Sequence, residues 1–387
     1  MRDVFILGAK RTPVGKRNGR FRSLPPEALA APAIRAAIDQ AGIGPEAVDE
    51  VIFGNAVGPG GNIARLALLQ AGLPVRVPGF TVDRQCAGGL EAVRLAAALI
   101  RSGAGRCCVA GGVESTSQEP VRLAPDGSRL ARPRFAPPSL GDPDMGEAAE
   151  AVARAYGIPR EAQDDWARRS QQRFLAAAAA GLFDEEIVPV PVPGPGEPPR
   201  EVARDETLRR PLPPAALRRL PPAFRPDGTV TAGNACRHSD GAAALVLAGP
   251  EVLERPEPAA CGVPRPLGRL VEVVAVGVPP DLPGTGPMAA LRELVARTGV
   301  DPGEIDLYEI NEPFAALVLA CIADLDLPPD RVNVWGGALA LGHPYAATGA
   351  ILLVRLLYGL HRTGGRLGAV ALGSAGGLGM AALVERV

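Results

Sequence analysis

A cysteine followed by glycines is the group in this sequence best placed for nucleophilic chemistry. The apolar stretch ending at Val82 predicts a buried strand, and Cys86 stands between it and a predicted helix over residues 90–101. The free N–H groups that begin a helix stabilise an anion, which predicts a thiol pKa below the usual value of about 8.5. Gly88 and Gly89 should leave room for a substrate to approach the backbone. The alternative interpretation is a small buried apolar residue, because free cysteines are often buried.

Two residues in the second half of the chain are candidates to act on such a thiol. His343 lies in a glycine-rich turn before a predicted helix, where the backbone is fixed and a ligand has room. Asn311 follows a predicted strand over residues 305–310. Each also has a simpler interpretation: a structural or surface histidine, and an asparagine that caps the next helix. Both become catalytic candidates only as members of a set with Cys86.

Apolar runs alternate with helical patterns through most of the chain. Strands are predicted over residues 4–8, 48–57, 106–114, 229–247, 270–278, 305–310, 332–334, 369–373 and 380–387. Helices are predicted over residues 28–42, 63–72, 90–101, 288–299 and 348–360. This alternation is typical of an α/β fold in which a mostly parallel sheet is covered on both faces.

The chain also divides into a repeat and an insertion. Residues 115–226 are rich in proline, but helical patterns over 144–156 and 160–181 favour an inserted loop domain over a disordered linker. Outside this region, three strand-like segments recur in order: 51–57, 80–83 and 107–112 correspond to 307–311, 332–336 and 369–373. We therefore predict two similar halves, residues 1–114 with 227–267 and residues 268–387. If they pack pseudo-symmetrically, Cys86 faces His343 across a shared cleft.

The composition excludes several classes of function. The chain has 387 residues, a net charge of −1 and 4% aromatic residues, so we expect no nucleic-acid partner. Its six cysteines show no CxxC spacing, and with three histidines they offer little for a zinc site, so no metal is expected. There is no run of about 18 apolar residues, so no membrane span is predicted. We expect a cytoplasmic protein.

Six segments together resemble the thiolase family, which comprises acetyl-CoA acetyltransferases and 3-ketoacyl-CoA thiolases. They are RQCAGG (84–89), GGVES (111–115), DMGEAAE (144–150), VTAGNA (230–235), NEPF (311–314) and GGALALGHPYAATG (336–349). The resemblance implies a duplicated five-layer αβαβα fold with an inserted loop domain for CoA binding and oligomerisation. It also implies a homodimer or homotetramer and a coenzyme A thioester as substrate, with no permanently bound cofactor.

The resemblance also implies roles for individual residues. Cys86 matches the nucleophile that carries the acyl group as a thioester. His343 matches the histidine that takes the thiol proton and then helps to bind the thioester oxygen, and Asn311 matches the asparagine that holds a water in that oxyanion hole. The backbone N–H groups of Cys86 and Ala375 match a second oxyanion hole. Acyl transfer needs an activated thiol and donors aimed at the developing alkoxide.

Contacts to CoA carry over with two changes of residue type. The residues that match nucleotide and pantetheine contacts of the family are Arg209, Met145, Ala232, Cys236 and Phe314. The family usually has a histidine before the methionine, but this chain has Asp144. Cys236 stands where the family has a serine that contacts CoA.

The largest departure from the family is at Gly373, which stands where a second catalytic cysteine is expected. In the family, that thiol removes the α-proton of the attacking acyl-CoA and protonates the leaving enolate in thiolysis. Glycine has no group that can do this. Ser374 is adjacent, but a serine hydroxyl is a very weak base and should point away from the site if the strand continues.

Three functions therefore remain open. The first is a thiolase-type C-acyltransferase whose base is water, the substrate or another residue. The second is a decarboxylative condensing enzyme or acyltransferase of a biosynthetic pathway, similar to ketosynthases of the same superfamily, in which loss of CO2 generates the carbanion. The third is a catalytically silent subunit that binds CoA or scaffolds a partner. The retention of Cys86, His343 and Asn311 argues against the third.

Overall fold

A computed structural model describes residues 2–194, 196–206, 211–254 and 265–387. Within them, ten strands form one sheet: β1 (Phe5–Arg11), β2 (Gly15–Lys16), β3 (Glu50–Gly54), β4 (Gly79–Val82), β5 (Cys107–Ser115), β8 (Ser239–Ala248), β9 (Gly268–Gly277), β10 (Leu307–Ile310), β11 (Leu367–Ser374) and β12 (Leu378–Glu385). The order is β10–β11–β12–β9–β1–β8–β5–β3–β4, and the short β2 pairs with β8.

The helices are α1 (Pro26–Ala41), α2 (Ile63–Gln70), α3 (Gly88–Ser102), α4 (Met145–Ala155), α5 (Arg160–Ala179), α6 (Pro214–Arg218), α7 (Pro250–Leu253), α8 (Gly286–Thr298), α9 (Ala315–Leu325), α10 (Ala338–Leu341) and α11 (Thr348–Thr363). Two 3₁₀ turns matter for the site, η2 (Gln85–Ala87) before α3 and η7 (Tyr345–Ala347) before α11.

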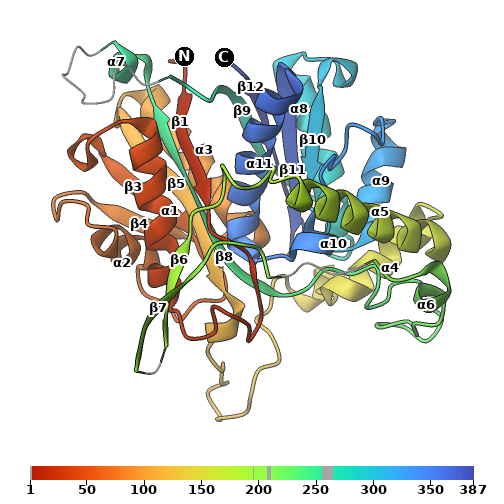
Figure 1. Cartoon of the computed structure of the whole chain (residues 1–387). Coiled ribbons are helices and arrows are strands. Elements are labelled where there is room, and N and C mark those ends of the chain that lie inside the picture. The colour runs from red at the N-terminus through yellow and green to blue at the C-terminus, as the bar shows by residue number, and fades with distance from the viewer. Residues whose placement is uncertain (1, 195, 207–210, 255–264) are drawn as a thin grey trace.

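The elements form five layers, because the two halves of the sheet lie on either side of a central layer of helices, α3 and α11 (Figure 1). Helix α3 packs on β3 and β5, α11 packs on β10 and β11, and the two helices contact each other. Helices α1 and α2 cover the outer face of the first half of the sheet, and α8 covers β9 and β12 of the second. The duplicated αβαβα fold predicted from the sequence is confirmed.

The two halves have the same connectivity. Strand β3 lies between β4 and β5 and is parallel to both. In the second half, β10 is parallel to β11 on one side and forms a single parallel bridge with Val332 on the other. In each half an antiparallel strand follows, β8 or β12, and the halves join where β1 pairs with β9. The equivalent helices end alike, because α3 and α11 both stop at a left-handed glycine, Gly103 and Gly364.

The prediction of a mostly parallel sheet is wrong. Among the described strands of this sheet, only the pairs β3–β4, β3–β5 and β10–β11 are parallel. Each half ends with a strand that pairs antiparallel to a neighbour. Strand β12 returns from β11 through a tight turn, and β8 pairs with β5 after the insertion. Strands that are covered on both faces of a sheet can therefore show continuous apolar runs although the sheet mixes parallel and antiparallel pairs.

Two predicted strand segments are absent because side chains take the place of strand hydrogen bonds. At residues 332–334, Asn333 has a φ of 47°, and its amide donates to the carbonyl of Ile310 and accepts the N–H of Ile310, both at 2.8 Å. At residues 229–238, the Glu150 carboxylate accepts the N–H groups of Thr229 and Val230 at 2.9 and 2.8 Å. The strand predicted over 229–247 therefore begins only at Ser239.

The region between β5 and β8 packs chiefly against the second half. Helices α4 and α5 contact α9, α5 also contacts α10, and α6 contacts α5. Part of its proline-rich stretch is a separate hairpin of β6 (Val190–Gly194) and β7 (Glu197–Val202), where a loop was predicted. Prolines are tolerated in this two-stranded ribbon because it has no further neighbour that needs their missing N–H groups.

Candidate active site

A cavity of about 480 Å³ brings together residues from both halves and the intervening region. Cys86 reaches it from η2, His343 from the turn before α11, and Gly373 from the end of β11. Of the residues named from the sequence, those lining the cavity are Cys86, Asp144, Met145, Cys236, Phe314, His343, Gly373 and Ala375. The structure thus brings Cys86 and His343 together, as the predicted pseudo-symmetry requires.

Hydrogen bonds from the second half fix the turn that carries Cys86. Ser374 Oγ accepts the N–H of Ala87 at 3.0 Å and donates to the carbonyl of Arg84 at 3.0 Å. Gln85 has a φ of 49°, a conformation that costs a residue other than glycine about 1–3 kcal/mol. Ser374 points away from the cavity toward this turn, so it positions the Cys86 segment and leaves proton transfer to other groups.

The reverse contact holds the corresponding turn of the second half. The Glu114 carboxylate, at the end of β5, accepts the N–H of Ala346 at 3.3 Å. Tyr345 takes the position that corresponds to Gln85 in η2, and it too has a positive φ, 22°. The turns η2 and η7 contact each other, so each half braces the turn that precedes the central helix of the other.

Close packing of these turns explains the glycines after Cys86. Gly88 and Gly89 are buried against η7 and the start of α11. A Cβ on Gly89 would lie 2.6 Å from the carbonyl oxygen of Ala346, a distance that side chains do not tolerate. The prediction that these glycines make room for substrate is wrong, because the space they leave is filled by the other half of the protein.

Burial raises the pKa of the Cys86 thiol to about 12, and the nearby Glu114 carboxylate adds to the shift. The sequence predicted the opposite direction from the helix N-terminus. Desolvation of the thiolate outweighs the field of the helix end here, and a neighbouring carboxylate disfavours a second negative charge. The resting thiol is therefore protonated at neutral pH and needs a base to become a nucleophile.

His343 is buried and neutral. Burial lowers its pKa to about 3, and His238 contributes to the shift. Its Nδ1 lies 2.7 Å from Thr348 Oγ1 at the start of α11, and its backbone N–H donates to the carbonyl of Arg237 at 2.9 Å. An imidazole whose Nδ1–H donates to the threonine hydroxyl has its lone pair on Nε2, the atom suited to accept a proton.

Asn311 directly follows β10 and has a buried, unpaired amide. The side chain is 2% exposed, and neither its Nδ2 nor its Oδ1 has a hydrogen-bond partner among the described residues. Its backbone N–H donates to the carbonyl of Ala371 in β11 at 2.9 Å, which fixes the residue two positions before the cavity-lining Pro313. A buried amide without partners is the kind of group that an ordered water or a ligand satisfies.

Glu312 organises the segment that follows, a role that the sequence did not indicate. Its fully buried carboxylate accepts hydrogen bonds from Trp166 Nε1 at 3.0 Å, Ser170 Oγ at 2.6 Å and Asn333 Nδ2 at 2.7 Å. These donors come from α5 and from the loop before α10. The acidic residue in the NEPF segment is therefore a structural anchor that fixes Asn311 and Phe314 on either side.

Gly373 leaves one wall of the cavity without a side chain. A Cβ there would lie 3.0 Å from Pro287 Cδ and 3.4 Å from the carbonyl oxygen of Pro283, so a side chain would require Pro287 to move slightly. Ala375, on the other side of Ser374, also lines the cavity. At this position, the structure places no proton-transferring group.

The residues expected to contact CoA separate into three groups. Met145, Cys236 and Phe314 line the cavity, and Phe314 packs edge-to-face on Phe224 with ring centroids 5.9 Å apart. Ala232 is exposed and does not line this cavity. Arg209 lies outside the described residues.

The sequence reasoning missed several polar residues of the cavity wall. His238 and Tyr345 line it, and the Tyr345 hydroxyl lies 2.5 Å from His238 Nδ1. The remaining charged lining residues are Arg17, Arg122, Arg132, Arg237, Glu119 and Asp144. The sequence places a tyrosine two positions after His343 and a histidine two positions after Cys236, but no pattern in it indicates that these two side chains are in contact.

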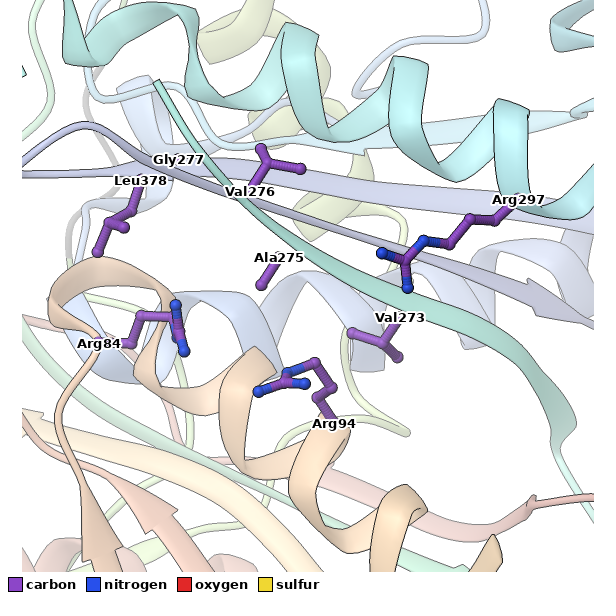
Figure 2. A pocket seen from close by; sticks show the side chains of 8 residues that line it. All are labelled: Arg84, Arg94, Val273, Ala275, Val276, Gly277, Arg297 and Leu378. Atoms are coloured by element: carbon purple, nitrogen blue, oxygen red, sulfur yellow. The ribbon is translucent and has the colours of Figure 1, made fainter. Parts of the chain in front are cut away.

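A second cavity, of about 330 Å³, lies between α3, β9 and the start of β12 (Figure 2). Figure 2 shows three arginines around it, Arg84, Arg94 and Arg297. Arg84 and Arg94 both pair with Glu91, at 3.0 and 2.6 Å. Its described lining residues include none of those that line the cavity at Cys86, so the two sites are separate.

The described residues contain neither a candidate metal centre nor a helix that could span a membrane. No group of three or more histidine, cysteine, aspartate or glutamate side chains there is arranged to hold a metal ion. Likewise, none of the helices described has the length and apolar character needed to cross a bilayer.

Known proteins share this architecture. Residues 4–251 match the family model "Thiolase, N-terminal domain", and residues 264–386 match "Thiolase, C-terminal domain". YhfS of Bacillus subtilis is 44% identical over 386 residues, which cover 99% of each chain. The crystal structure of the Bacillus anthracis acetyl-CoA acetyltransferase has a TM-score of 0.92 at 38% identity, covering 100% of this chain and 99% of that one. For human mitochondrial 3-ketoacyl-CoA thiolase, the TM-score is 0.91 at 33% identity, with the same coverage.

The fold and these matches define the class as a five-layer α/β acyltransferase. Within that class, the chain belongs to the thiolase family. The resemblance found in the sequence motifs is therefore confirmed, over nearly the whole chain.

Proposed function

We propose that this protein is an acyl-CoA C-acyltransferase of the acetyl-CoA C-acetyltransferase type, which carries the acyl group as a thioester on Cys86. The observation that carries the proposal is that Cys86 and His343, which are 257 positions apart in the sequence (343 − 86), line the same cavity of about 480 Å³. The likeness to solved thiolases supports it, because the Bacillus anthracis relative is named an acetyl-CoA acetyltransferase.

Acylation begins from a neutral thiol and a neutral imidazole. As Cys86 Sγ attacks the thioester carbon, the S–H proton passes to His343 Nε2, and the CoA sulfur leaves and takes that proton. Thr348 Oγ1 lies 2.7 Å from Nδ1 and can accept its proton, which would hold the imidazole with the lone pair on Nε2. The high pKa of Cys86 and the low pKa of His343 disfavour a thiolate and an imidazolium in the resting site. During the attack the two charges form together and attract each other, which lowers the cost of separating them.

Two groups of donors are suited to the oxyanions. The buried, unpaired amide of Asn311 can hold a water for the hole shared with His343. The backbone N–H groups of Cys86 and Ala375 can form the second hole, since both residues line the cavity. Preorganised donors of this kind contribute when negative charge develops on the substrate oxygen.

The cavity suits a CoA thioester as substrate, with no cofactor bound between turnovers. Met145, Phe314 and Phe224 supply an apolar wall for the pantetheine arm. Four arginines among the lining residues are matched by only two carboxylates, so the entrance favours an anionic ligand. We include Arg209 and Ala232 among the proposed CoA contacts on the strength of the sequence resemblance.

A decarboxylative condensing enzyme is the second candidate function, and Gly373 is the observation that favours it. Loss of CO2 from a malonyl thioester would generate the carbanion without a base at position 373. The same Cys86, His343 and Asn311 would serve the acylation half-reaction, so acylation alone does not separate the two candidates.

Intact-protein mass spectrometry tests the proposal. After incubation with acetyl-CoA and longer acyl-CoAs, we expect one acyl group per chain, mapped to Cys86 and absent from Cys86→Ala. His343→Ala should slow acylation about 10²–10⁴-fold, and Asn311→Ala should cost less in acylation than in carbon–carbon bond formation. Products that require malonyl-CoA would favour the decarboxylative enzyme, and a chain that no acyl-CoA labels would support the silent subunit.

We also propose a homodimer or homotetramer that forms through the edge of the first half. Strand β4 ends the sheet and carries Phe80, which is 37% exposed. In the loop before β4, Val75 is 77% exposed. Light scattering of Phe80→Lys should report a smaller assembly; an unchanged mass counts against this surface. None of the five described cysteines forms a disulfide, which suits the reducing cytoplasm that we propose.

A further inference from the structure

We propose that Tyr345 and His238 form the acid/base pair that moves the α-proton of the acyl-CoA, in place of a thiol at position 373. This inference rests on the proposed acyltransferase function and adds the residues that carry its second half-reaction. The requirement is specific, because carbon–carbon bond formation from an unactivated acyl-CoA needs a base near the α-carbon, and Gly373 offers none.

The geometry places both rings on the wall that Cys86 and His343 share. The Tyr345 hydroxyl lies 2.5 Å from His238 Nδ1, with the two ring centroids 5.5 Å apart and the rings 73° from coplanar. On its other side, the Tyr345 ring meets the His343 ring edge-to-face, also at 5.5 Å. Tyr345 therefore links the imidazole beside the thiol to a second imidazole in the same cavity.

The backbone holds this pair firmly. His238 and His343 form a parallel bridge, in which the His343 N–H donates to the carbonyl of Arg237 at 2.9 Å. The carbonyl of His238 accepts the N–H of Arg17 at 3.1 Å. Tyr345 stands in η7, which Glu114 braces through Ala346. A fixed proton acceptor next to the reacting carbon is what general acid–base catalysis requires.

The charge states suit a relay. Burial raises the pKa of Tyr345, and negative charge at Cys86 and Cys236 would add to the shift. Burial lowers the pKa of His238, and Arg17 contributes. At neutral pH, the proposed relay starts from a phenol and a neutral imidazole. With the imidazole protonated at Nε2, the phenol O–H donates to Nδ1 and keeps an oxygen lone pair for a second proton.

The proposed step balances without any further reactant. The α-C–H bond of the acyl-CoA breaks and its proton bonds to Tyr345 Oη, while the phenol proton passes to His238 Nδ1. The electron pair of the C–H bond becomes the enolate, whose carbon attacks the thioester on Cys86. Cys86 leaves as a thiolate and takes up the proton held by the His238 imidazolium, which restores the neutral groups. In thiolysis the Cys86 thiol proton passes to His238, and a proton then moves from His238 through Tyr345 to the carbon of the leaving enolate.

Cys236 is the competing candidate, because its thiol lines the same cavity. The tyrosine–histidine pair is favoured since the Tyr345 ring packs directly against the His343 ring and has its own proton acceptor. Cys236→Ser separates the two: its α-proton exchange, taken relative to Cys86 acylation in the same variant, should fall far less than that of Tyr345→Phe. Loss of exchange in Cys236→Ser, with exchange kept in Tyr345→Phe, would overturn the inference and assign the base to Cys236.

The test measures two half-reactions on the same full-length protein. Acylation of Cys86 by acetyl-CoA is followed by intact-protein mass spectrometry, and α-proton exchange is followed as deuterium uptake into acetyl-CoA in D2O. Tyr345→Phe keeps the ring against His343 but removes the hydroxyl, and His238→Gln removes the proton acceptor. Each should reduce exchange about 10²-fold or more, a far larger loss than any change in the rate of acylation.

Matched controls remove the same groups elsewhere. Tyr156→Phe deletes a hydroxyl that lies 3.4 Å from Asp324 Oδ1, and His361→Gln replaces a histidine that lies 2.7 Å from the carbonyl of Leu267; neither lines the cavity. Both should keep exchange and acylation. Exchange that survives both Tyr345→Phe and His238→Gln would overturn the inference. So would a wild-type protein that acylates Cys86 and exchanges no α-protons, whereas a wild type that never acylates would refute the proposed function instead.

Discussion

His343 Nδ1 lies 2.7 Å from Thr348 Oγ1, so the first turn of α11 sets the orientation of the cavity histidine. A neutral ring protonated at Nδ1 donates to this hydroxyl, which leaves the free lone pair on Nε2, as the proposed acylation requires. The same helix that fills the central layer of the fold thus determines which nitrogen faces the chemistry.

Thr348→Val should slow acylation of Cys86 about tenfold. The variant keeps the volume of the side chain but leaves the buried Nδ1–H without an acceptor, a loss of about 1–3 kcal/mol that favours the other tautomer. The measurement is the rate of acylation by acetyl-CoA in quenched samples analysed by mass. Thr363→Val, which removes a hydroxyl at the far end of α11, is the control and should acylate normally. A normal rate in Thr348→Val would show that Thr348 does not set the tautomer.

Alkylation of Cys86 should rise with pH across a wide range. Because burial raises its pKa to about 12, the thiolate fraction grows about tenfold per pH unit from pH 7 to pH 10. Peptide mapping after iodoacetamide treatment measures the rate at Cys86 separately from Cys236, and pre-acylation with acetyl-CoA should protect it. A rate that levels off above pH 9 would show that burial does not raise the pKa of Cys86, and a plateau already below pH 8 would mean that the helix terminus lowers it.

His343→Gln should reduce the acid sensitivity of the fold. The folded pKa of about 3 lies below the unfolded value of about 6.5, so the unfolded state binds more protons between these values. The contribution of this group to the free energy of unfolding is complete above pH 6.5. It is lost as the pH falls, by about 1.4 kcal/mol per pH unit. His238, also lowered, should add a smaller loss.

Urea unfolding at pH 7 and pH 5 measures the difference. The free energy of unfolding of the wild type should fall by about 2 kcal/mol more than that of His343→Gln between the two conditions. Equal losses in the two proteins would show that His343 titrates normally in the folded state.

Ser374→Ala should weaken both the fold and the acylation step. The change removes the hydroxyl from the N–H of Ala87 and the carbonyl of Arg84, which keep their bond to each other at 3.0 Å, so we expect a loss of about 0.5–1.5 kcal/mol. We expect slower acylation because the Cys86 turn loses its contact with β11. Ser128→Ala, in an exposed loop, is the control for loss of a hydroxyl. If the acylation rate in Ser374→Ala equals that of the wild type, the turn is fixed by other contacts.

Gly373→Cys should raise α-proton exchange and rescue Tyr345→Phe. The thiol would stand on the cavity wall, at the cost of a small displacement of Pro287. Gly373→Ala supplies the same Cβ without the thiol and should rescue nothing. Deuterium uptake into acetyl-CoA by the single and double variants is the measurement. If alanine and cysteine behave alike, the effect comes from the shape of the pocket and no thiol base has been restored.

Most of the fold was predictable because local rules and burial agree. The helices α1, α2, α3, α8 and α11 begin and end within a few residues of their predicted bounds, since apolar periodicity and glycine caps mark both ends. The failures come where a side chain replaces the backbone. Asn333 supplies the strand-like bonds to Ile310, and Glu150 occupies N–H groups that an extended segment would have paired.

The site was predictable only in part. Cys86 and His343 stand out in glycine-rich turns, and the repeat of strands predicts that those turns converge. The thiol pKa was predicted in the wrong direction, because the helix end is local in sequence whereas burial and Glu114 depend on the assembled fold. Tyr345 and His238 were missed for the same reason, since their 2.5 Å contact joins two loops 107 positions apart.

The crossed bracing of the two turns also orders events during synthesis. Ser374 holds the turn of Cys86, and Glu114 holds the turn that follows His343. An emerging chain that ends before β11 contains Cys86 and His343 but lacks Ser374, the brace of the cysteine turn. The turn that carries the thiol therefore gains this brace only when almost the last strand has been synthesised.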